Sequence, residues 1–145
     1  MKPGLPRKQK GAAAIEFAAV FVIFFAVFYG LVSYSVPLLM MQSFHQATAE
    51  ALRQAVKVDP NTPNYATTVQ NLALGVVQAQ TGWIPSAFNF GASDYSATYS
   101  SGVLTVSVNY PISKLNQVMP QVVLPLIGPV PSLPSSLSVQ SSLQF

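Results

Sequence analysis

The longest apolar stretch of the chain lies near its N-terminus. Residues 17–32 read FAAVFVIFFAVFYGLV, in which only Tyr29 carries a polar tip. Extended to Met41, this run would form about 37 Å of α-helix, which is enough to cross a hydrocarbon core of about 30 Å. A helix is also the local structure that satisfies every backbone polar group in lipid. We therefore predict a transmembrane helix over residues 12–41.

Beyond residue 41 the apolar positions recur at helical spacing. The segment SFHQATAEALRQAVK places one stripe on one helix face, made of Phe44, Ala47, Ala51, Leu52, Ala55 and Val56. Glu50 and Arg53 are three residues apart and can pair on the solvated side. Asp59-Pro60-Asn61 is a stop signal. One long helix over about 12–57 is expected, with 42–58 as its extracytoplasmic extension, and Pro37 could kink it near the outer interface.

The pattern after residue 59 predicts a small α+β domain over 59–145. Residues 65–80 have the periodicity of a second helix, with apolar positions Val69, Leu72, Ala73, Val76 and Val77. Segments 94–99 and 103–110 flank Ser100-Ser101-Gly102 and predict a β-hairpin, and 137–145 alternates like a third strand. We expect one helix packed on a three- or four-stranded antiparallel sheet.

Residues 114–134 interrupt this pattern with an apolar, proline-rich stretch that contains VVLPLIGPVPSLP. Its prolines argue against a regular helix or a central strand. Two interpretations stay open. This loop either faces a partner or the membrane surface, or it wraps across the sheet to cover an edge.

The charges add a direction to the predicted membrane helix. The chain carries a net charge of +3, and only 8% of its residues are charged. Four cations stand in the first ten residues: Lys2, Arg7, Lys8 and Lys10. Cations before a span keep that end cytoplasmic, so the domain after residue 41 should be periplasmic. The basic balance belongs to the N-terminus and does not indicate a nucleic-acid partner.

Small residues stand before the apolar run, where an ordinary secretory signal would place them after it. Gly11 is followed by AAAIEF, so cleavage between Gly11 and Ala12 would remove a basic leader, 1–11, and leave the helix intact. Glu16 would then lie four residues from a new amine on Ala12. A carboxylate in an apolar span is usually placed for a reason. The alternative is that Glu16 merely sits at the headgroup boundary.

This junction resembles that of the Flp/Tad pilus system, in which a prepilin peptidase cuts after glycine ahead of a Glu-Phe pair, here Glu16-Phe17. The length, the layout and the run HQATAEALRQAVK resemble a TadE-like minor pilin or pseudopilin. The resemblance implies cleavage at Gly11 and Ala12, with Glu16 and Phe17 acting in processing or assembly. It also implies an inner-membrane location and a role in building an adhesive pilus, with links to biofilm formation and secretion.

The partners implied by the resemblance are the prepilin peptidase, other pilins, inner-membrane assembly proteins and the lipid bilayer. Small faces would allow close helix packing, through Ala12, Ala13, Ala14, Ala18 and Ala19. Three alternatives are a secreted binding protein cut before Val36, an uncleaved membrane-tethered binding or scaffold protein, and a type II secretion pseudopilin.

The residues offer no set for catalysis. The chain has no cysteine and one histidine, His45, which we expect to be interfacial or solvated. We therefore expect no enzyme activity, no cofactor and no metal site. Tyr95, Tyr99 and Tyr110 are expected to pack on the sheet rather than to form a ligand platform.

Overall fold

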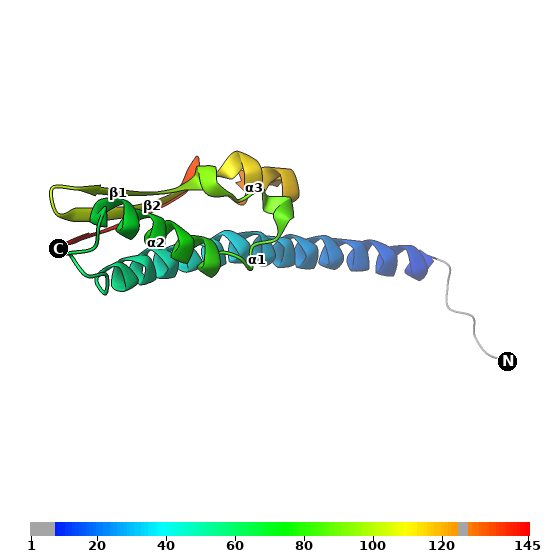
Figure 1. Ribbon diagram of the computed structural model, residues 1–145. Coiled ribbons are helices and arrows are strands. Elements are labelled where there is room, and N and C mark those ends of the chain that lie inside the picture. Colours follow the sequence, from blue (N-terminus) through cyan, green and yellow to red (C-terminus); the bar gives the residue numbers. More distant parts are fainter. Residues whose placement is uncertain (1–7, 125–127) are drawn as a thin grey trace.

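A single helix, α1 (Lys8–Ala55), runs the length of the molecule in the computed structural model (Figure 1). The structure describes residues 8–124 and 128–145, with side chains from Gly11 onward, so most of the predicted leader lies outside the described residues. The other elements are α2 (Tyr65–Gln80), β1 (Tyr95–Ser100), β2 (Val103–Pro111), α3 (Ile112–Val118), β3 (Val122–Leu124), β4 (Gly128–Val130) and β5 (Ser136–Gln144). Two short 3₁₀ turns, Ser86–Phe88 and Ala92–Asp94, lead into β1. The predicted α+β class, with its long N-terminal helix, is confirmed.

The second half of α1 is a core helix of the domain. The predicted stripe is buried at five of its six positions: Phe44, Ala47, Ala51, Leu52 and Ala55. The prediction was wrong for Val56, which is 53% exposed because the helix ends at Ala55 and the chain turns there. Pro37 does not interrupt the helix, and it is buried beneath the domain.

Helices α1 and α2 form one layer, and a three-stranded antiparallel sheet in the order β1-β2-β5 forms the other (Figure 1). Along β2, every second residue is buried: Leu104, Val106, Val108 and Tyr110. The helices supply the facing side chains, with Val69, Ala73 and Val77 buried on α2. This alternation is typical of an antiparallel sheet with one covered face. The predicted helix over 65–80 and the predicted helix-on-sheet packing are thus confirmed.

The hairpin forms where the sequence predicts it. Ser100 pairs with Val103, and the two residues between them, Ser101 and Gly102, have φ of 52° and 78°. A two-residue loop with positive φ at both positions matches the right-handed twist of the strands. The third strand, β5, pairs with β2 over its whole length. The sheet among the described residues is three-stranded.

A buried ion pair joins α3 to the 3₁₀ turn that precedes β1. Asp94 is 4% exposed, and Lys114 donates to its two carboxylate oxygens at 2.6 and 2.8 Å. Asp94 also accepts from the Gly91 amide at 2.9 Å. Tyr110 donates to the Phe88 carbonyl at 2.7 Å. Burial, together with the nearby Asp94 carboxylate, raises the pKa of Tyr110 to about 12.

The proline-rich stretch differs from its prediction in two ways. Its first residues, 114–118, are helical in α3, because the prolines of the stretch begin only at Pro120. After Pro120, β3 and β4 pair with each other in a separate two-stranded sheet, called the ribbon below. The ribbon does not extend the main sheet. It lies along α1 instead.

Candidate membrane and assembly interface

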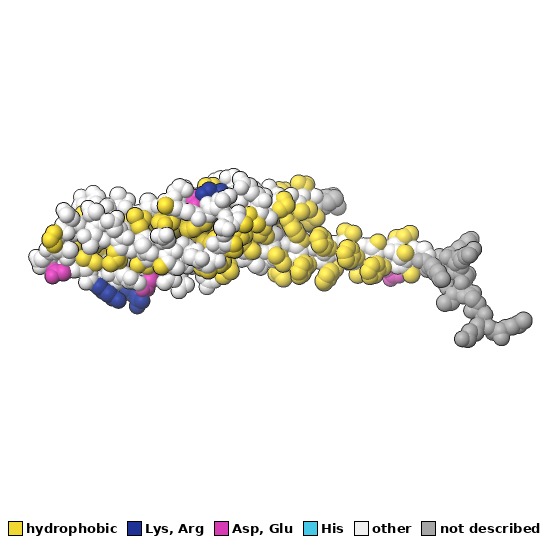
Figure 2. All heavy atoms as spheres, turned by 45° about the vertical axis from the view of Figure 1, so that its right-hand side comes forward, with side chains coloured by type: hydrophobic (Ala, Val, Ile, Leu, Met, Phe, Trp, Pro, Cys, Tyr) yellow, Lys and Arg dark blue, Asp and Glu magenta, His cyan; other side chains and the backbone are white. Residues whose placement is uncertain are grey.

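The N-terminal turns of α1 are exposed. Every residue from Gly11 to Phe25 is exposed, and an 18-residue window within the helix has a mean hydropathy of 2.4 with none of it buried. Apolar side chains cover this end of the molecule, whereas the opposite end is mostly polar (Figure 2). A single long apolar N-terminal helix of this kind fits a membrane anchor.

Aromatic side chains follow one face of the exposed half at four-residue spacing. Neighbouring ring centroids lie 6.2 Å apart from Phe17 to Phe21 and 6.3 Å apart from Phe21 to Phe25 and from Phe25 to Tyr29. Residues four apart are neighbours on a helix surface, so the rings stack along the axis. Phe17 therefore begins a continuous apolar ridge that ends at the hydroxyl of Tyr29.

The predicted cleavage junction lies in the first turns of α1. Gly11 and Ala12 are both helical and exposed. A Cβ atom added at Gly11 would meet nothing within 4 Å. Glycine in a helix interior is about 1 kcal/mol less favourable than alanine. Packing among the side chains that the structure describes therefore gives no reason for a glycine at this position.

Glu16 is exposed among apolar neighbours. The ion pairs found among the side chains that the structure describes are Arg53–Glu50 and Lys114–Asp94, and neither involves Glu16. Phe17, its neighbour, is 70% exposed. The structure leaves Gly11, Ala12, Glu16 and Phe17 on one accessible stretch of helix, near one another but in no cavity. Their predicted roles stay predictions.

The ribbon packs on the middle of α1, from which it is far in sequence. Tyr29 donates a hydrogen bond to the Pro120 carbonyl, just before β3. Tyr34 accepts one from the Ser132 amide at 2.8 Å, just after β4. Between them, the nearest atom to a Cβ built on Gly30 is Cγ1 of Val130, at 4.0 Å. Two tyrosines thus fasten the two ends of the ribbon segment to one turn and a half of the helix.

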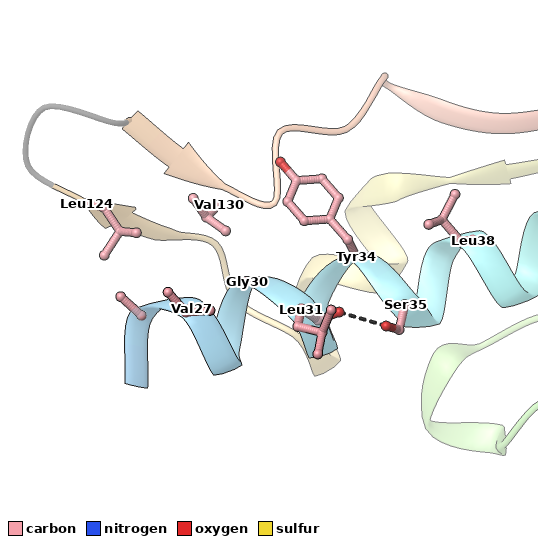
Figure 3. A pocket seen from close by; sticks show the side chains of 9 residues that line it. Val27, Gly30, Leu31, Tyr34, Ser35, Leu38, Leu124 and Val130 are labelled. Carbon is pink, nitrogen blue, oxygen red and sulfur yellow. Dashed lines mark hydrogen bonds between the residues drawn. The ribbon is translucent and has the colours of Figure 1, made fainter. Parts of the chain in front are cut away.

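A groove of about 540 Å³ remains between the ribbon and α1 (Figure 3). Leu124 and Val130 project from the two strands toward the helix, which contributes Val27, Leu31 and Leu38. A smaller pocket of about 140 Å³ lies beside it, between Val122 of β3 and the aromatic ridge. Both are lined almost wholly by apolar side chains.

Sequence reasoning missed the fastening of the ribbon. The available signal was the pair of tyrosines, Tyr29 and Tyr34, at the outer end of an otherwise apolar run, because buried tyrosine hydroxyls usually find a partner. Which partner they find depends on a contact across about a hundred residues, which no local pattern reports.

The remaining predicted residues take ordinary positions. His45 is exposed, as expected. Tyr110 is buried, and Tyr95 and Tyr99 pack against the core, so the expectation of sheet packing is confirmed. Over residues 8–124 and 128–145, no three histidine, aspartate or glutamate side chains gather closely enough to hold a metal ion.

These features define the class of protein: an α+β domain built on the C-terminal half of a single helix whose N-terminal half fits a membrane anchor. A narrower assignment comes from comparison with known proteins. Residues 11–53 match the family model described as TadE-like protein. The resemblance noted at the junction is confirmed for this segment, which begins at Gly11. Neither the curated proteins nor the solved structures include a significant match.

The TadE-like match is consistent with a protein associated with a Tad pilus and with its other components. The matched residues end two positions before α1 does. The match therefore covers the helix and not the domain that folds on it.

Proposed function

We propose that this chain is a TadE-like minor pilin or pseudopilin that a prepilin peptidase cleaves between Gly11 and Ala12. The observation that supports this most directly is Gly11 itself. The family match begins at this residue, and the fold makes no use of its missing side chain. Gly75 on α2 is equally open, so the support comes from the position of Gly11 directly before AAAIEF, where a processing enzyme has to accommodate the backbone.

Cleavage would hydrolyse the Gly11–Ala12 peptide bond and leave a free amine on Ala12. Four helical residues span about 6 Å along the axis, so this amine would lie one turn from the Glu16 carboxylate. The pair could form within one chain, or between the amine of one chain and Glu16 of another. A contact between chains would offset the charge of both groups at the point where helices pack in an assembly.

The mature protein would take part in assembling an adhesive pilus from the inner membrane, with its C-terminal domain in the periplasm. The exposed apolar half of α1 supports this role, because it offers other pilins or assembly proteins an uncovered helix surface. The role is structural: the chain would act by packing and not by catalysis.

A secreted protein cut before Val36 is a poorer explanation. That cut would fall inside α1, where Ser33 and Pro37 are buried beneath the domain. The cut would also remove Tyr29 and Tyr34, which hold the ribbon segment.

The first test is the N-terminal sequence and intact mass of the protein taken from native membranes. The proposal requires a chain that starts at Ala12. A start at Met1 would favour an uncleaved tether, and a start at Val36 would support secretion. Gly11→Val should leave the precursor uncleaved, whereas the neighbouring control Ala13→Val should be processed normally. Normal cleavage of Gly11→Val would contradict the peptidase assignment.

Glu16 is tested separately from cleavage. Glu16→Ala should be processed and inserted but should lose most pilus assembly, measured by surface piliation. Glu50→Ala is the matched control, because Glu50 stands on the same helix but in its outer half, paired with Arg53. Full piliation of Glu16→Ala would show that the carboxylate has no assembly role.

A further inference from the structure

The ribbon lies beside a part of α1 that a bilayer would cover. If Ala12 marks the inner boundary, Phe21 lies about 14 Å and Leu31 about 29 Å along the helix. A hydrocarbon core is about 30 Å thick. The ribbon and its pockets face residues from Phe21 to Leu38. Tyr29 and Tyr34, which hold the two ends of the ribbon segment, lie about 26 Å and 33 Å along the helix. A membrane-anchored α1 therefore brings the ribbon to the outer boundary of the hydrocarbon core.

The ribbon surface is chemically suited to lipid. Val123 is 73% exposed and Val122 is 38% exposed. From Leu115 to Phe145 the sequence contains no charged residue. Immersing this segment therefore requires no charge to leave water, which would be its largest energetic cost.

The backbone of the ribbon is partly adapted as well. The strands pair at Val122 with Val130, at Val123 with Pro129 and at Leu124 with Gly128. Pro129 and Pro131 have no N–H group to leave unpaired. At the two ends, Tyr29 and Tyr34 bond a carbonyl and an amide that would otherwise face the lipid. Lipid-exposed strand edges do not occur within the hydrocarbon region, so the ribbon fits at the outer interface, where headgroups and water can bond its free edges.

We propose that the ribbon is a second membrane-contacting element, which lies at the outer interface of the bilayer beside α1. Acyl chains would cover Val122 and Val123 and fill the 540 Å³ groove that Leu124 and Val130 form with the helix. The occupant is lipid because the groove continues the exposed apolar surface of α1 and has polar lining residues only at Tyr34 and Ser35. This inference rests on the membrane anchoring in the proposed function, but not on cleavage or pilus assembly.

The chain has no cysteine, so single cysteines can be labelled without altering a native thiol. The probe is a nitrobenzoxadiazole dye placed by Val123→Cys in the full chain, reconstituted into phosphatidylcholine–phosphatidylglycerol vesicles with nitroxide-labelled acyl chains. Phe24→Cys, on the exposed half of α1, reports anchoring. Ser96→Cys, on the polar outer face of β1, reports water.

Position 123 should emit further to the blue than position 96, and nitroxide should quench it several-fold more strongly. Aqueous iodide should show the reverse order. Quenching at 24 but not at 123 would overturn the proposal while leaving the anchor intact. Absence of nitroxide quenching at both would refute the anchoring and the ribbon proposal together.

A second copy of the chain is the remaining competitor for this surface. The measurement is therefore repeated at increasing lipid-to-protein ratio. Lipid contact predicts that nitroxide quenching at 123 is unchanged by dilution. Shielding from iodide that is lost on dilution would mean that another protein chain covers the ribbon, and the proposal would be wrong.

Discussion

The two halves of α1 are both rich in apolar residues, yet they meet different surroundings. In the C-terminal half, Phe44 is fully buried under the sheet and α2. In the N-terminal half, Phe24 is 65% exposed. Hydrophobic burial stabilises the folded domain mainly in the first case, because the second phenylalanine keeps most of its surface exposed after folding. The comparison separates the apolar surface that the chain buries within its own fold from the apolar surface that only lipid or a partner could cover.

The largest test exchanges the same residue type in each half. Phe44→Ala should lower the free energy of unfolding of the domain by about 3–5 kcal/mol, because it leaves a cavity at a fully buried site. Phe24→Ala should change it by less than about 0.5 kcal/mol. The measurement is urea unfolding in micelles, followed by fluorescence of Trp83, the single tryptophan. Equal changes in the free energy of unfolding for the two substitutions would contradict the proposed difference between the halves.

A second comparison sets the buried ion pair against the exposed one. Asp94→Ala leaves the Lys114 ammonium and the Gly91 amide without their shared partner. Removing one member of such a pair should cost about 3 kcal/mol in unfolding free energy. Glu50→Ala breaks an ion pair whose arginine is 71% exposed, and should have a far smaller effect. A similar loss in both variants would mean that the domain does not depend on the buried pair.

The boundary between the halves gives the smallest expected effect. A leucine at Gly30 would extend toward Val130, whose Cγ1 is already 4.0 Å from a Cβ atom at this position. Gly30→Leu should push the ribbon from the helix and cost about 1–3 kcal/mol. Gly75→Leu is the control on α2, where an added Cβ meets nothing within 4 Å. Proteolysis within the ribbon segment, slow in the control and fast in Gly30→Leu, would sharpen the assignment of this boundary.

Local signals predicted most of the elements. The bounds of α2 follow from its periodicity, and the hairpin follows from Ser101-Gly102 between alternating segments. The stripe ran one residue too far, to Val56, because periodicity does not mark where a helix ends. The short helix α3 was missed because residues 114–134 were treated as one segment, although its first proline is Pro120.

Contacts distant in sequence were beyond that reasoning. The Asp94–Lys114 pair joins two elements, and the ribbon meets α1 across about a hundred residues. Hydropathy gives the same value to a residue that faces lipid and to one that faces protein. Within the predicted span 12–41, it could not indicate that Ser33 and Pro37 lie beneath the domain while Leu38 and Leu39 remain exposed. For the candidate site, the sequence predicted the junction residues, whereas the packing of the ribbon on α1 became visible only in the structure.

The continuity of α1 also has a mechanical consequence. The helix is unbroken from its exposed apolar half to Ala55, and the domain is fixed to its C-terminal half by Phe44 and the other buried side chains. From Phe21 to Ala55 the helix measures about 51 Å. A tilt of about 20°, common for transmembrane helices, would therefore swing the outer end sideways by about 17 Å. A small change in the tilt of the helix would therefore produce a large displacement of the domain.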